Sequence, residues 1–214
     1  RNEDNEIDKI ELSNSQALNF ITYLFEHYNE ELESYSDWQL AMGINYIFNN
    51  GLSEYTFAFY SSECSIGDKV RAMQSLKVLY RECYDKRCIS SNDRTIRYQN
   101  KLNAQCYYLW DTATVISYYE PMELTDQPMS DCGMYDRNMR DLNKMKHKDI
   151  MYNTILDVIK FALYLQNKEC TLSALKGFIE ISGLVVNTRK VVDDYLTNSG
   201  TTDSEILKLA KYVY

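Results

Sequence analysis

The sequence predicts an all-α protein, either an irregular helical bundle or a short HEAT-like stack of antiparallel helical hairpins. Apolar residues recur at helical spacing in most segments, and three segments begin with the pattern that caps a helix N-terminus. Only residues 52–60 alternate as a strand does, and no partner strand is evident. Because an isolated strand leaves its backbone unpaired, an extended connection or a short helix fits this segment equally well.

Two capping boxes define the first helices. One begins at Ser13, and the apolar positions that follow it continue at helical intervals as far as Leu32. The other begins at Ser36 and opens a second helix that ends near Gly51. The connection between them is short, so we expect an antiparallel hairpin. A third long helix is expected over 66–84.

The segment 150–166 is the best candidate for the element around which the chain is built. Its apolar residues occupy more than one side of the expected helix, so other elements must pack against several sides of it. Three shorter amphipathic segments follow, at 171–184, 187–198 and 202–212, and are expected to pack against it. Thr171 and Asn187 are the expected caps of the first two, and Thr202 opens a third capping box.

The length of 214 residues fits a single helical domain spanning 1–214. Both prolines, Pro121 and Pro128, lie in the polar run 120–133, where we expect a long irregular loop. Two lobes divided near this loop are the alternative. A short, strongly charged helix is expected over 134–146.

Acidic residues concentrate in the first part of the chain. The first 63 residues contain twelve acids and two bases, a net charge of −10, and because the whole chain carries −8, the remainder carries +2. Such an acidic segment repels phosphate backbones, which argues against nucleic acid as a direct partner and permits a basic protein as one. A solvated face that only maintains solubility is the alternative.

Neither a membrane nor an oxidising compartment is indicated. No apolar run reaches the roughly 18 residues that a membrane helix requires, and the polar start shows no signal-peptide segment. A chain of this size does not need disulfides, so reduced thiols and a cytoplasmic location are expected. The six cysteines concerned are Cys64, Cys83, Cys88, Cys106, Cys132 and Cys170.

The sequence lacks the residue patterns of common enzymes. A serine or cysteine nucleophile needs a positioned base, and the only two histidines, His27 and His147, lie near no activating motif. Asp131, Asp136 and Asp141 recur every five residues, a spacing that drifts around a helix instead of gathering ligands. We therefore expect a protein that is not an enzyme and has no catalytic residue, metal or cofactor.

Two segments resemble signatures of a known group. LNAQCYYLWD at 102–111 and SALKGFIE at 173–180 are similar to LNxxCYMWWD and ALHGLGHW, which recur in a group of uncharacterised bacterial proteins. The resemblance implies an all-helical bacterial protein and no catalytic residues. This chain departs from the signatures at Leu109, which replaces a Trp, at Lys176, which replaces the first His, and at Ile179 and Glu180, which replace the final His-Trp.

Tyrosine is abundant, with 19 residues, and aromatic side chains beside acidic segments favour protein binding. Acids speed the encounter with a cationic partner, and aromatic anchors slow its departure. Our leading hypothesis is a bacterial immunity protein that covers the active site of a basic toxin, such as a nuclease. The expected contacts are Glu30, Glu31, Glu33 and Asp37, with Tyr35 and Trp38 as anchors.

Three alternatives remain at this stage. The first is a helical scaffold that binds another protein or peptide in a groove, and the second is a metal-dependent hydrolase with an acidic site. A homodimer is the third, because it would also account for exposed apolar residues.

Overall fold

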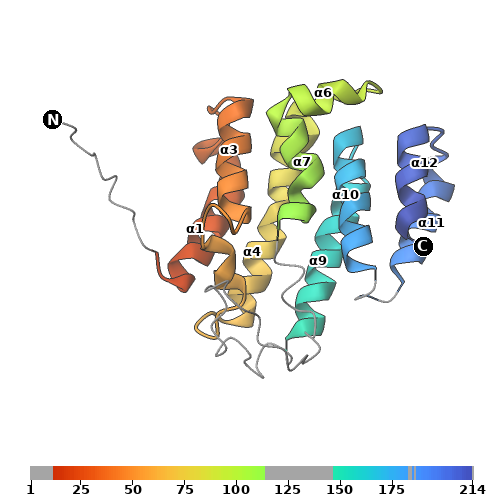
Figure 1. Cartoon of the computed structure of the whole chain (residues 1–214). Helices are drawn as coiled ribbons and strands as arrows, with labels where there is room; N and C mark the ends of the chain where they lie inside the picture. Colours follow the sequence, from red (N-terminus) through yellow and green to blue (C-terminus); the bar gives the residue numbers. More distant parts are fainter. Residues whose placement is uncertain (1–11, 114–146, 183–184, 186, 214) are drawn as a thin grey trace, which may run out of the picture.

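The computed structural model describes residues 12–113, 147–182, 185 and 187–213. Helices joined by short turns and loops make up this part of the chain, which confirms the predicted all-α class (Figure 1). The described residues contain no β-strand, only one isolated bridge between Asn49 and Ala113. Buried apolar residues form one cluster that runs from Ala17 to Val213. None of the described helices is long and apolar enough to cross a membrane. The predicted loop at 120–133, the lobe boundary there and the charged helix at 134–146 lie outside the described residues.

The helices follow one another with short connections in the described parts of the chain. In chain order they are α1 (Asn14–Glu26), α2 (Tyr28–Glu31), α3 (Asp37–Phe48), the 3-10 helix η1 (Tyr55–Phe59), α4 (Ile66–Val78), the π-helix η2 (Leu79–Tyr84), α5 (Asp85–Arg87), α6 (Arg94–Gln99), α7 (Lys101–Thr112), α9 (Lys148–Leu163), α10 (Lys168–Ile181), α11 (Thr188–Ser199), α12 (Ser204–Ala210) and η5 (Lys211–Val213).

Two rows of helices lie side by side (Figure 1). One row runs α1, α4, α9, and the other runs α3, α7, α10, α12, each helix packing against the next in its row. The rows meet where α9 packs against α10, and η1 packs against both α1 and α3. This arrangement resembles a short stack of helix pairs, with α3 at one end of its row and α12 at the other.

The most buried helix is α10, and it replaces α9 as the central element. The structure confirms a helix near 150–166 as α9, but α9 packs mainly against α4 and α10. In contrast, α10 packs against α7, α9, α11, α12 and η2, and ten of its fourteen residues are buried. Apolar spacing does not predict this central position, because several buried residues of α10 are small or polar.

Local capping patterns predicted some helix starts correctly. Ser13 and Ser36 are both N-caps of complete capping boxes, as expected. Thr171 is not a cap, because α10 begins three residues earlier behind Asn167, and Thr171 is buried inside the helix. The cap of α12 is Asp203 and not Thr202.

Three further predictions can be compared with the backbone. The first helix ends at Glu26 instead of continuing to Leu32, and the single turn α2 follows the break at His27. The strand-like segment contains the 3-10 helix η1, so the short-helix alternative was correct. The third long helix is present as α4 continued by η2.

The described cysteines carry free thiols, as predicted. All of them are buried, and burial raises the pKa of the Cys83 thiol to about 12. They are Cys64, Cys83, Cys88, Cys106 and Cys170, whereas Cys132 lies outside the described residues.

Gly177 marks a close approach between three helices. A Cβ atom at this position of α10 would lie 2.8 Å from Cδ1 of Ile159 in α9 and 2.9 Å from Cδ1 of Trp110 in α7. Both neighbours are buried, so we expect Gly177→Ala to lower the free energy of unfolding by about 1–3 kcal/mol, as overpacked cores do. Urea denaturation measures this change.

Gly43→Ala is the matched control for that substitution. A Cβ at Gly43 in α3 meets nothing within 4 Å, so the control should equal or exceed the wild-type stability. A Gly177→Ala protein as stable as the Gly43→Ala protein would contradict the close packing of α10.

Candidate functional site

A line of large apolar side chains lies on the outside of α3. Trp38, Met42 and Tyr46 are 60%, 44% and 46% exposed. They are spaced by four residues, so they follow one another along the same side of the helix for about 12 Å. The opposite side of α3 carries its buried residues, Leu40, Ala41, Ile44, Ile47 and Phe48. We call Trp38, Met42 and Tyr46 the α3 face.

Ring contacts extend the α3 face toward α1. Tyr46 meets the ring of Tyr55 edge-on, with 5.9 Å between centroids, and Tyr55 in turn lies 5.8 Å from Phe20 of α1. Phe20 is itself exposed. The aromatic surface therefore crosses from α3 over η1 to α1.

Three carboxylates precede the α3 face in the chain. Glu30 and Glu33 are exposed, and Glu31 accepts a hydrogen bond of 2.8 Å from the hydroxyl of Tyr23. That hydrogen bond raises the pKa of the Tyr23 phenol. None of the three glutamates forms an ion pair with a described residue, so their charges are available to a partner.

Arg87 holds the turn between α2 and α3, which carries Glu33. Its guanidinium donates to Oδ1 of Asp37 at 2.8 Å and to the backbone carbonyls of Glu33 and Tyr35 at 3.1 and 2.8 Å. A fourth hydrogen bond of 3.2 Å reaches the hydroxyl of Tyr28. The charge of Asp37 is thus neutralised within the chain, and this residue has a structural role.

The six residues predicted as contacts lie within one short stretch, from α2 to the first turn of α3. Four of them are exposed, namely Glu30, Glu33, Tyr35 and Trp38, while Glu31 and Asp37 are half-buried. Met42 and Tyr46 were not among the predicted contacts. The signal was available in the spacing of Leu40, Ile44 and Ile47, which defines the buried side of α3 and leaves its opposite side exposed.

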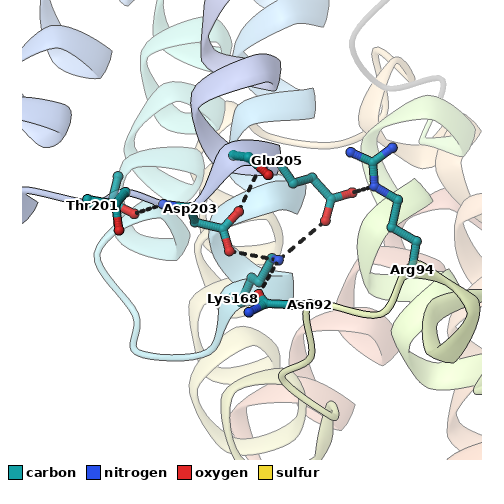
Figure 2. A pocket seen from close by; sticks show the side chains of 8 residues that line it. Asn92, Arg94, Lys168, Thr201, Asp203 and Glu205 are labelled. Carbon is teal, nitrogen blue, oxygen red and sulfur yellow. Dashed lines mark hydrogen bonds and ion pairs between the residues drawn. The ribbon is translucent and has the colours of Figure 1, made fainter.

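A second candidate is an open polar hollow of about 510 Å³ beside the start of α12 (Figure 2). Lys168 from α10 lies at its centre and pairs with Asp203 at 2.8 Å and with Glu205 at 3.4 Å. Arg94 from α6 also pairs with Glu205, at 3.3 Å. The lining charges therefore neutralise one another (Figure 2).

The hollow continues into a buried ion pair. Arg97 donates to Glu205 at 2.9 Å and forms two hydrogen bonds of 2.7 and 3.0 Å with Glu169 of α10. Burial raises the pKa of Glu205, but the hydrogen bond and charge of Arg97, with Arg94 and Lys168, outweigh it and hold this pKa below its usual value. These contacts join α6, α10 and α12, so we assign the cluster a structural role.

Metal binding finds no support in the part of the chain that the structure describes. Within it, no group of three or more His, Cys, Asp or Glu side chains is placed to hold a metal ion. Asp131, Asp136 and Asp141 lie outside that part.

No family model, no curated protein and no solved structure matches the chain. The resemblance of 102–111 and 173–180 to two bacterial signatures therefore stays a prediction.

The structure does bring these two segments together. They form most of α7 and the middle of α10, which pack against each other. Lys176 pairs with Asp111 across this contact at 2.8 Å, while Trp110 and Gly177 are in contact range in the core. The segments thus form the packed centre of the protein.

Proposed function

We propose that this chain is a protein-binding inhibitor of the bacterial immunity class, which acts in the cytoplasm on a basic toxin. The supporting observation is the α3 face, exposed beside three glutamates that have no ion pair among the described residues. Aromatic anchors rimmed by charge are typical of protein interfaces. A nuclease fits as the target, because a cleft that holds nucleic acid is basic.

The outer side of α3 differs from what a terminal helix of a stack needs, which is a polar outer side that keeps it soluble. At the other end of the row, α12 exposes Leu207 beside Ser204 and Lys208, and η5 exposes Tyr212. On α3, three large apolar side chains, Trp38, Met42 and Tyr46, follow one another along one side of a single helix. This continuous line favours a covering partner.

A pull-down with this chain as bait tests the proposal, with elution in a salt gradient. We expect a single basic protein that elutes only at high salt, because charge attraction weakens with ionic strength. The variant Glu30→Lys/Glu33→Lys should bind that protein about tenfold more weakly. The activity of the captured protein is then assayed with and without the bait.

The matched control is Asp149→Lys/Asp194→Lys, which changes the net charge equally but affects exposed acids on α9 and α11. It should retain the captured protein as the wild type does. Equal losses in both variants would contradict a specific acidic site. A captured protein that keeps its full activity when saturated would contradict inhibition and favour the scaffold alternative.

A further inference from the structure

Gly43 exposes helix backbone without a side chain beside the α3 face. It lies in the middle of α3, where glycine lowers helix stability relative to alanine, and it is exposed. A Cβ atom added there would meet nothing within 4 Å, so no contact inside the described chain requires a glycine. A glycine at an exposed helical position lets another backbone approach closely.

The position of α3 at the end of its row indicates which kind of secondary structure could pack against its exposed side. On its buried side α3 packs against another helix, α7, while the described elements leave Trp38, Met42 and Tyr46 exposed. Three anchors spaced by four residues form a ridge of the kind that packs into the grooves of a neighbouring helix. The ridge is long enough to contact about two turns of such a helix.

Charge distinguishes a foreign partner from a second copy of this chain. No Lys or Arg occurs between Lys9 and Lys69, so the same face of a second copy would leave Glu30, Glu31 and Glu33 without a cation. Asp37 is the only charged residue within α3, so the acids lie at one end of the face. A partner that complements these charges would carry its cations at the one end of its binding surface that lies near these acids.

We infer that the α3 face docks an amphipathic α-helix of the partner, with its backbone closest at Gly43 and basic side chains near Glu30 and Glu33. This inference rests on the proposed function and specifies the element that binds. The docked helix extends the row α3, α7, α10, α12 by one member. Its apolar stripe covers Trp38, Met42 and Tyr46.

The probe is a labelled synthetic helical peptide with a leucine stripe at i, i+3, i+4 and i+7 and lysines at one end. Fluorescence anisotropy compares it with a scrambled peptide of equal composition and with a peptide in which glutamates replace the lysines. We expect the amphipathic basic peptide to bind at least about tenfold more tightly than either control, since only it complements both the stripe and the acids. Equal binding of the three peptides would overturn the inference.

Gly43→Leu is the decisive variant, because leucine covers the exposed backbone at Gly43 without removing an anchor or an acid. It should bind the basic peptide about tenfold more weakly while it unfolds at no lower urea concentration than the wild type. Gly67→Leu is the matched control, since Gly67 is also an exposed helical glycine and its Cβ would meet only Ser65 Oγ at 3.6 Å. Unchanged binding by Gly43→Leu would refute the close approach.

The same variants separate this inference from the proposed function. If Gly43→Leu retains the captured protein but Glu30→Lys/Glu33→Lys loses it, the inhibitor proposal stands and helix docking fails. If the peptide binds in a Gly43-dependent manner and the captured protein keeps its activity, docking stands and inhibition fails. A wild-type dimer in light scattering that Gly43→Leu dissociates would overturn the inference and assign the face to a second copy.

Discussion

Replacement of Arg97 by methionine is expected to lower the free energy of unfolding by about 3–5 kcal/mol. Arg97 and Glu169 are only 3% and 2% exposed, and two hydrogen bonds join them. Methionine keeps much of the packing against Tyr107, whose ring centre lies 4.1 Å from the guanidinium carbon, but it leaves Glu169 buried without its cation. Urea denaturation at neutral pH measures the loss.

The double variant Arg97→Met/Glu169→Leu serves as the control for this prediction. It removes the orphaned carboxylate together with the guanidinium, so it should be more stable than Arg97→Met alone. A single Arg97→Met variant within about 1 kcal/mol of the wild type would show that the ion pair does not hold α6 against α10.

Trp38→Ala is expected to weaken binding of the captured protein by about 30-fold to 1,000-fold, which corresponds to about 2–4 kcal/mol. Trp38 presents the largest side chain of the α3 face and is 60% exposed, so its removal should leave the fold intact. Binding is measured by titration calorimetry or surface plasmon resonance, and thermal unfolding checks the stability of the variant.

Tyr212→Ala is the matched control for Trp38→Ala. Tyr212 is an aromatic residue of similar exposure, 62%, but it lies in η5 near the C-terminal end of the chain. It should bind the captured protein with wild-type affinity. Equal losses at Trp38 and Tyr212 would point to non-specific aromatic contact and contradict a site on α3.

Local sequence determined which structural features could be predicted. The caps at Ser13 and Ser36 involve partners only three residues away, so the sequence alone predicts them. At the start of α10 the side-chain oxygen of Asn167 accepts from the N–H of Glu169, two residues away, but the choice of this cap also depends on distant partners. The side-chain amide of Asn167 donates to the carbonyls of Asp85 and Cys88, about 80 residues earlier. The spacing of residues along the chain does not predict these long-range hydrogen bonds.

In the candidate site, too, some features follow from neighbouring residues and others depend on contacts between distant parts of the chain. Its acids and its first anchor, Trp38, adjoin one another in the sequence and were predicted together. Met42 and Tyr46 are apolar themselves, so they are separated from the core residues of α3 only by the helical spacing of Leu40, Ile44 and Ile47, and not by composition. The pairing of Asp37 with Arg87, which spans 50 residues, became visible only in the fold.

The four hydrogen bonds of Arg87 also affect the thermodynamics of recognition. They order the turn of Glu33 and Tyr35 while the chain folds, so the loss of backbone conformational entropy there precedes any encounter. A partner then meets acids that are already positioned, and little of the interaction free energy is spent on ordering them. Under the proposed function, this turn is therefore ordered before the partner arrives.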